Sequence, residues 1–460
     1  MTTRRAFLIS IAALPLAACE GGPLDDDDSA EPDDDDSSVS DDDDSGDSTP
    51  EPPPPFPIEG SLEPGSFPSA IQVCDALPDS VLVAFRTMEP DVHLVLGKAD
   101  PLGDVLVWES PLLPVPDGIL NLEVTDLEAD TSYLLYAIDP ARTRRSDVVQ
   151  FRTALAPGTS RPLRIAASSC FGRSGAPWQS LRQTTQGNPD LCLLLGDTVY
   201  ADGAETLEEY RGFWDEALST DGLYYASLAT SFVATWDDHE VDNNWTWSGA
   251  ADRFPAALAS FREAFPQRPG PAEERVYRTL RWGDAVEVIS LDCRADRGDG
   301  RYISQEQMDW LKNILTTSTA RFKLILNSVP IIDFSDWIGG ISADDRWQGT
   351  PEQRTDLLSF LEDEGIEGVL FLSGDMHFGS VCQVSGDGEV GSGHWEVMAG
   401  PAGSTINPMA YLPPSWTDQY DLVIASWNSV LLDLDPSTGE VGVTFLDDEG
   451  SVIGERLLSL

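Results

Sequence analysis

Basic side chains are scarce in this 460-residue sequence, which has 28 Lys and Arg against 79 Asp and Glu and a formal net charge of −51 at pH 7. A protein that binds nucleic acid through the phosphates needs a basic surface, so this balance argues against such a partner. It argues equally against electrostatic attraction to an anionic membrane. Long apolar runs are also missing: beyond the N-terminal region, no segment has 18 consecutive apolar residues, the minimum expected of a membrane-spanning helix.

The N-terminal region has the pattern of a cleaved export signal. Arg4 and Arg5 precede a short apolar run over residues 6–16, and small residues lead from there to Cys19. The first part resembles a twin-arginine signal, and Leu-Ala-Ala-Cys resembles a bacterial lipobox, in which the cysteine is acylated. The alternative is an ordinary secretion signal in which Cys19 is incidental. We expect export and lipid anchoring at the bacterial cell envelope, in the periplasm or at the cell surface, with the lipid as the only membrane contact.

Residues 20–59 contain many acidic side chains and no Lys or Arg. The sequence DDDDS occurs three times with a period of eight residues, and four prolines follow at positions 52–55. Charge repulsion and proline keep such a segment extended, so it is expected to be a solvated, disordered linker after a signal at residues 1–19.

Cysteine is rare as well, with six in the chain. If Cys19 is acylated, the five that remain are an odd number, which favours a separate role for one thiol in an exported protein. The other four could pair in three ways, and the sequence leaves the pairing open. Those five are Cys74, Cys170, Cys192, Cys293 and Cys382.

Two patterns divide the remaining chain. Residues 60–156 consist of short apolar runs separated by turns, which predicts an all-β sandwich of the immunoglobulin or fibronectin kind. The segment 127–133 resembles the tyrosine-bearing corner of fibronectin type III modules. Over 157–460, helix-start signals at Thr206, Ser304 and Thr350 alternate with compact apolar strands, which indicates a layered α/β structure.

Metal-binding or charged side chains follow each of six predicted strands in this second region. In α/β sheets the carboxyl ends of parallel strands border the ligand-binding crevice, so these side chains should converge there. The strands are expected at 163–167, 191–195, 232–235, 286–291, 322–326 and 369–372. The residues that follow them include Cys170, Asp197 and Tyr200, Asp237, Asp238 and His239, Asp292 and Arg294, Asn327, and Asp375 and His377.

Carboxylates and histidines combined with a tyrosine and a thiolate suit a pair of hard trivalent or divalent ions better than a structural zinc site. A carboxylate such as Asp197 can bridge two ions at the separation that two-metal hydrolysis uses. Two ions also lower the pKa of a bound water, which makes hydroxide available as the nucleophile.

Five motifs, in this order, resemble those of the PhoD-type alkaline phosphatases, a metallophosphatase family. They are Ser-Ser-Cys at 168, Gly-Asp-x-x-Tyr at 196, Thr-Trp-Asp-Asp-His-Glu-Val-x-Asn-Asn at 235, Leu-Asp-x-Arg-x-x-Arg at 291 and Ser-Gly-Asp-x-His at 373. The resemblance covers residues 65–460. It implies a four-layer α/β/β/α metallophosphoesterase core with a preceding β-sandwich, a site with Fe³⁺ and Ca²⁺ or other divalent ions in their place, and phosphate esters as substrates.

The resemblance also assigns roles to individual residues. Asp197 would be shared between the two metals, and a Tyr200 phenolate would keep iron in its oxidised state. The implied iron ligands are Cys170, Asp197, Tyr200 and His377, and the implied calcium ligands are Asp197, Asp238 and Asp375.

Three further residues are expected to contact the substrate. In the wider metallophosphoesterase pattern Gly-Asn-His, the last residue faces the substrate, so His239 would protonate the leaving oxygen or hold the phosphoryl group. Arg294 and Arg297 would contact phosphate oxygens, because guanidinium groups match that geometry. Asp237 either orients His239 or caps a helix.

Two positions depart from the family pattern. Cys293 stands where the family tends to have threonine, and Phe171 replaces a polar residue beside the predicted iron. Neither change removes a predicted ligand.

Three functions follow from these patterns. The first is an alkaline phosphatase that hydrolyses phosphate monoesters, in phosphate metabolism. The second is a phosphodiesterase with phospholipase-D-like activity on lipid or polymer phosphodiesters. The third is a catalytically dead binding module at the cell surface. We expect the protein to be a monomer.

Overall fold

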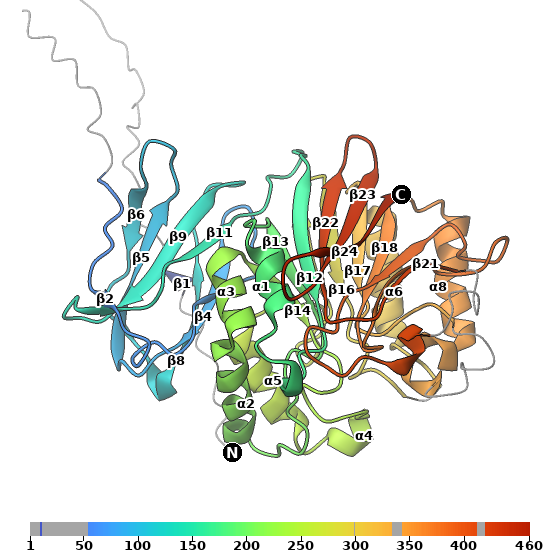
Figure 1. Ribbon diagram of the computed structural model, residues 1–460, viewed down its shortest axis with the longest axis horizontal. Coiled ribbons are helices and arrows are strands. Elements are labelled where there is room, and N and C mark those ends of the chain that lie inside the picture. Colours follow the sequence, from blue (N-terminus) through green and yellow to red (C-terminus); the bar gives the residue numbers. More distant parts are fainter. Residues whose placement is uncertain (1–9, 12–53, 299, 334–342, 412–418) are drawn as a thin grey trace, which may run out of the picture.

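The computed structural model describes residues 10–11, 54–298, 300–333, 343–411 and 419–460 (Figure 1). Nearly all of the predicted export signal and acidic linker lie outside the described residues. No helix in the described ranges is both long enough and apolar enough to cross a membrane.

Three sheets account for the strands of the described chain. The first sheet has the order β1 (Ser10–Ile11), β8 (Ile119–Val124), β4 (Val81–Arg86), β3 (Gln72–Cys74), β14 (Phe232–Thr235), β13 (Leu191–Leu195), β12 (Leu163–Ser168), β22 (Ser429–Asp435), β23 (Glu440–Leu446) and β24 (Val452–Ser459). The second has the order β2 (Ser61–Leu62), β10 (Arg144–Arg145), β9 (Ser132–Ile138), β5 (Asp91–Lys98) and β6 (Val105–Glu109), with β11 (Val149–Arg152) beside β9 and β7 (Leu113–Pro114) beside β5. The third has the order β15 (Arg278–Trp282), β16 (Val286–Ser290), β17 (Phe322–Leu326), β18 (Val369–Ser373), β20 (Trp395–Met398), β19 (Gly379–Gln383) and β21 (Tyr420–Ile424).

Three helices begin where the sequence predicts starts. Thr206 forms a capping box with Glu209, and the Ser304 hydroxyl accepts a hydrogen bond from the backbone N–H of Gln307. Pro351 occupies the first turn of its helix, where its missing N–H is not needed. The helices are α1 (Gln179–Thr185), α2 (Leu207–Ser219), α3 (Asp221–Ala229), α4 (Trp247–Ala250), α5 (Phe254–Ala264), α6 (Gln305–Thr317) and α8 (Pro351–Asp363).

Side-chain alternation in the buried strands produces four layers. In β13, Leu193 and Leu195 face the core between the first and third sheets, whereas Leu194 faces the cluster formed with α1 and α2. In β17, Leu324 faces the same central core, and Ile325 packs with α6 and α8. Figure 1 shows these two groups of helices on opposite sides of the paired sheets. The predicted four-layer α/β/β/α core is therefore confirmed.

The N-terminal β region is joined to this core by a shared sheet. β3 lies beside β14, with Cys74 opposite Phe232, so the strands of the two regions form one continuous sheet. Directly after β3, the Asp75 carboxylate accepts hydrogen bonds of 2.7 Å from two guanidinium nitrogens of Arg278 on β15. The domain boundary predicted between residues 156 and 157 stays a prediction. Strands before and after it are hydrogen-bonded to each other and share one hydrophobic core.

The structure contains a tyrosine corner, and its described cysteines form no disulfide. The Tyr133 hydroxyl accepts a 2.8 Å hydrogen bond from the backbone N–H of Glu128, the interaction that defines a tyrosine corner. The five described cysteines, Cys74, Cys170, Cys192, Cys293 and Cys382, are buried free thiols, and none of the three possible pairings is present among them.

Candidate metal centre

The predicted metal ligands lie just after the strands that carry them, in strained turns. Cys170 follows β12, Asp197 follows β13, and Asp375 and His377 follow β18. All four have positive φ angles, of 58°, 53°, 60° and 55° respectively. Left-handed backbone is uncommon outside glycine, and such residues cluster at functional sites.

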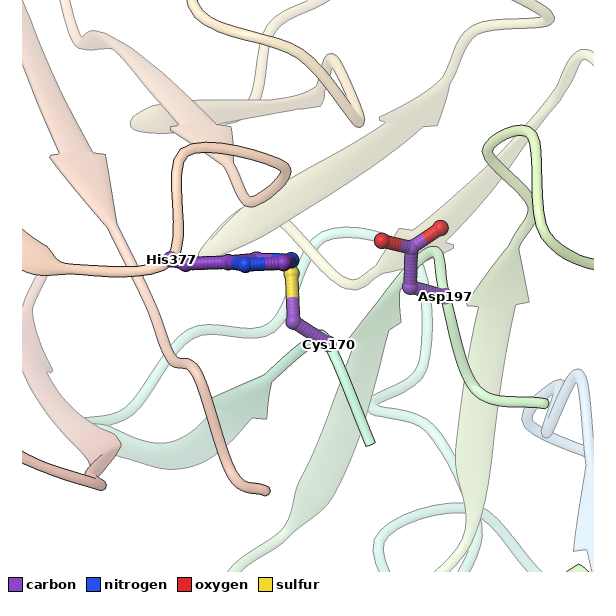
Figure 2. A group of neighbouring side chains, drawn as sticks. All are labelled: Cys170, Asp197 and His377. Carbon is purple, nitrogen blue, oxygen red and sulfur yellow. The ribbon is translucent and has the colours of Figure 1, made fainter. Parts of the chain in front are cut away.

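Three of the predicted iron ligands meet in one place. Cys170, Asp197 and His377 each offer a donor atom, and these atoms lie within 4.8 Å of one another (Figure 2). The Tyr200 hydroxyl joins them, 3.3 Å from Asp197 Oδ2 and 3.4 Å from His377 Nε2. The structure thus brings together all four residues that the family resemblance assigns to iron.

A second group of donors shares Asp197 with the first. Donor atoms of Asp197, Asp238 and His239 also lie within 4.8 Å of one another. Asp375 belongs to neither group, and its carboxylate lies 4.0 Å from the Arg294 guanidinium. Two adjacent donor groups with one carboxylate in common are the arrangement that a bridged metal pair requires.

The buried acidic groups of Asp197 and Cys170 have raised pKa values, as expected of ligands whose charge a metal ion would offset. Burial and the charge of Asp238 raise the pKa of Asp197 well above its usual value, and burial together with Asp197 does the same for Cys170. Asp197 Oδ1 is buried and has no hydrogen-bond partner within the described part of the chain. A buried acceptor without a partner is costly, and a metal ion would satisfy it. The residues present therefore fit a metal centre.

His239 is oriented by Asp202, a residue outside the five predicted motifs. Its Nδ1 lies 2.8 and 2.9 Å from the two oxygens of Asp202, and its ring packs on Tyr200 with centroids 4.0 Å apart. Burial alone lowers the pKa of His239, but the hydrogen bond to Asp202 and the charge of Asp238 outweigh it, and the pKa lies above its usual value. Because Asp202 occupies Nδ1, Nε2 is the nitrogen left for substrate or metal.

Asp237 has neither of the roles predicted for it. Its carboxylate accepts hydrogen bonds of 2.7 and 2.8 Å from Arg294 and one of 2.9 Å from the Ser328 hydroxyl. The alternatives that Asp237 orients His239 or caps a helix are wrong, because Asp202 holds the His239 ring and no helix of the described chain begins beside Asp237. The ion pair between Asp237 and Arg294 was not predictable from the sequence, because the two residues are 57 positions apart.

The two arginines predicted to contact phosphate already have carboxylate partners. The Arg294 side chain is 0% exposed, and it binds Asp345 as well as Asp237. This placement argues against direct contact between Arg294 and a substrate and indicates a counter-charge for the surrounding acids. Arg297, with a side chain 10% exposed, binds Asp345 and donates a 2.9 Å hydrogen bond to the Tyr302 hydroxyl. Its contact with phosphate stays a prediction.

The two positions that depart from the family pattern are both in packed surroundings. Phe171 packs edge-on against Trp178, with ring centroids 5.4 Å apart. The Cys293 thiol is buried 3.5 Å from the carbonyl oxygen of Asn327, and burial raises its pKa to about 12. Neither side chain belongs to the donor groups described above.

The fold and the shared-carboxylate site define a metallophosphoesterase. The family model for PhoD-like phosphatases matches residues 165–431, more than half of the chain, and the protein belongs to that family.

Two curated relatives match part of the sequence. Alkaline phosphatase D of Bacillus subtilis (strain 168) is 27% identical over 292 residues, which are 50% of this chain and 49% of the relative. Purple acid phosphatase 15 of Arabidopsis thaliana is 26% identical over 248 residues, 46% of this chain and 42% of the relative. The chain thus spans about half the length of the curated relatives it matches.

Solved structures show the same fold over most of the chain. A structure of PhoD matches with a TM-score of 0.74 and 20% identity, covering 86% of this chain and 89% of that one. A purple acid phosphatase from yellow lupin (Lupinus luteus) seeds matches with a TM-score of 0.61 and 14% identity, covering 85% and 75%. These likenesses establish the fold alone.

Proposed function

We propose that this protein is a metal-dependent alkaline phosphatase that hydrolyses phosphate monoesters. One observation carries the proposal: two donor groups share Asp197 at the strand ends of a chain that belongs to the PhoD-like phosphatases. A dead binding module would have no need to hold buried acidic groups together at raised pKa.

The donor chemistry supports two different metals. A thiolate, a phenolate, an imidazole and a carboxylate suit Fe³⁺, and the all-oxygen set of Asp197, Asp238 and Asp375 suits Ca²⁺. The residues that would hold iron are Cys170, Asp197, Tyr200 and His377. When bound, the two cations would supply Lewis acidity and lower the pKa of the attacking water.

The remaining chemistry falls to residues of the chain itself. Asp202 holds the His239 ring through Nδ1, so Nε2 can give a proton to the leaving oxygen. Arg294 offsets part of the negative charge of Asp237, Asp238 and Asp375. Arg297 is the remaining candidate for contact with the phosphoryl oxygens.

The proposed localisation at the cell envelope rests on the amino-acid sequence alone. Arg4, Arg5, the apolar run and Cys19 support export and lipid anchoring at the cell envelope. Mass measurement of the mature protein tests this, since we expect an acylated N-terminal Cys19. An N-terminus upstream of Cys19 would contradict it.

Hydrolysis should be measured with the purified protein at alkaline pH on an aryl phosphate monoester and the matching diester. We expect faster turnover of the monoester, loss of activity with chelator and recovery when iron and calcium are returned. Faster turnover of the diester would select the phosphodiesterase instead. If the fully metallated protein hydrolyses neither ester, both enzymatic functions are overturned.

A further inference from the structure

One loop after β20 contacts three of the four predicted iron ligands. Ser404 N–H donates a 3.1 Å hydrogen bond to the Cys170 carbonyl, and the Ser404 hydroxyl oxygen lies 2.5 Å from the Tyr200 hydroxyl oxygen. The Thr405 carbonyl lies 3.1 Å from His377 Nδ1. The loop therefore contacts Cys170, Tyr200 and His377 at once, although it carries none of the motifs that predicted the site.

The other neighbour of the Ser404 hydroxyl leaves the hydroxyl hydrogen available for Tyr200. The backbone N–H of Gly172 donates to Ser404 Oγ at 3.1 Å, so this oxygen is an acceptor there and its own hydrogen remains for Tyr200. Ser404 is only 4% exposed, which limits the access of water. A Cβ at position 172 would lie 2.7 Å from Ser404 Oγ, so glycine is needed for this approach.

The other two neighbours of the Tyr200 oxygen cannot donate to it once a metal is bound. Asp197 is an acceptor when ionised. His377 faces the Thr405 carbonyl with Nδ1, which must carry the hydrogen, so Nε2 presents a lone pair. Ser404 is then the neighbour that has a proton to offer to a Tyr200 phenolate.

We propose that Ser404 is a positioning residue that donates a hydrogen bond to the Tyr200 phenolate and thereby sets its electron donation to bound Fe³⁺. This inference rests on the proposed iron site. A hydrogen bond to a phenolate lowers the energy of its lone pairs, so it should raise the energy of the phenolate-to-iron charge-transfer transition. Outer-sphere hydrogen bonds of this kind tune metal centres generally.

The test compares the visible spectra of the iron-loaded wild type and Ser404→Ala at matched iron content. The wild type should show a tyrosinate-to-iron charge-transfer band, and the variant should retain iron but absorb at longer wavelength. A band that stays in place would overturn the role of Ser404. A wild type that binds iron without any such band would instead overturn Tyr200 as an iron ligand.

A matched control distinguishes the effect of losing the Ser404 hydroxyl from the effect of destabilising the loop that carries it. Trp427 Nε1 donates a 2.9 Å hydrogen bond to the Ser404 carbonyl, so Trp427→Phe weakens the loop but leaves the hydroxyl in place. The band should not move in this control, and an equal shift there would contradict the proposal. Ser404→Thr, which restores a hydroxyl, should return the band toward its wild-type position.

A measurement on the wild type keeps the inference testable if Ser404→Ala does not fold. The Ser404 hydrogen exchanges with solvent, so resonance Raman spectra excited in the charge-transfer band should show a shift of the tyrosinate C–O mode in D₂O. Identical spectra in H₂O and D₂O would overturn the proposed hydrogen bond.

Discussion

Four residues of the candidate metal centre have backbone conformations that destabilise the folded state. Cys170, Asp197, Asp375 and His377 have left-handed backbone, which costs about 1–3 kcal/mol at a strained non-glycine residue. Burial and neighbouring acids also raise the pKa of Asp375 well above its usual value. The metal-free protein should therefore gain stability when one of these acids is removed.

Asp197→Asn tests this at the shared carboxylate. Asparagine tolerates a positive φ, so the backbone should be unchanged. Because the pKa of Asp197 is higher in the folded than in the unfolded state, this group destabilises the fold at pH values above its unfolded pKa, near 3.8. At pH 8 the metal-free variant should melt at least about 2 °C above wild type. Its kcat/KM should fall by more than about 10²-fold, because loss of an outer-sphere partner alone reaches that range.

The pH dependence provides the control for Asp197→Asn. The difference in melting temperature between the metal-free proteins should grow from pH 4 to pH 8, since the wild type bears the cost of the buried acid only at the higher pH. Scanning calorimetry with chelator present would measure it. Equal melting temperatures at pH 8 would contradict the destabilising effect of the buried Asp197, and wild-type metal content in the variant would contradict its bridging role.

Motifs predicted the donors of the site but not the residues that hold them. Cys170, Asp197, Tyr200 and His377 were predictable because each follows a strand or belongs to a motif. Asp202 and Ser404 were not, because an isolated Asp or Ser in a turn carries no pattern. The carboxylate partners of Arg294 were not predictable either, because a sequence does not show which acidic side chains surround a guanidinium.

At the scale of elements, one carboxylate ties the turn after β13 to the turn after β14. Glu240 accepts hydrogen bonds from the backbone N–H groups of Asp197, Thr198 and Asp237, at 3.2, 2.6 and 2.9 Å. It is fully buried, and burial raises its pKa to about 7 although the amides act in the opposite direction. The relative position of the two turns therefore depends on the Glu240 side chain, which binds their backbone amides.

Glu240→Gln should loosen both turns together. A glutamine places an NH₂ group against backbone donors, so at least one amide loses its partner, which costs about 1–3 kcal/mol of unfolding free energy. Metal affinity should fall about 10–100-fold. Titration of the metal-free protein with calcium and iron measures this. The exposed Glu274→Gln is the matched control, and equal affinities in the two variants would contradict the role of Glu240.

The extents of the elements were more predictable than their partners. The strands predicted at 191–195, 232–235 and 322–326 have the same bounds as β13, β14 and β17. Such runs are recognisable because both faces are buried and most of the residues are apolar. Pairing was not predictable: β3 has three residues, and nothing in so short a segment indicates that it lies beside β14.

At the scale of the whole molecule, the β region before residue 157 and the phosphatase core share one sheet and one hydrophobic core. Residues of β4 and β5, such as Val83 and Leu94, belong to the same buried cluster as Leu193 and Leu324. The Asp75–Arg278 pair lies at this junction with side chains 0% and 3% exposed. We therefore expect the two regions to unfold together.

Asp75→Asn should test that cooperativity. Asp75 has a φ of 45°, which asparagine tolerates, so the main effect is an unpaired, buried Arg278. Removing one partner of a buried pair costs about 3–5 kcal/mol. The exposed pair Arg164–Asp433 gives the control, and Asp433→Asn should cost less than about 1 kcal/mol. Denaturant unfolding followed by tryptophan fluorescence and circular dichroism should give one transition with a lower midpoint for Asp75→Asn. Two separate transitions in the wild type would show that the shared sheet does not couple the regions.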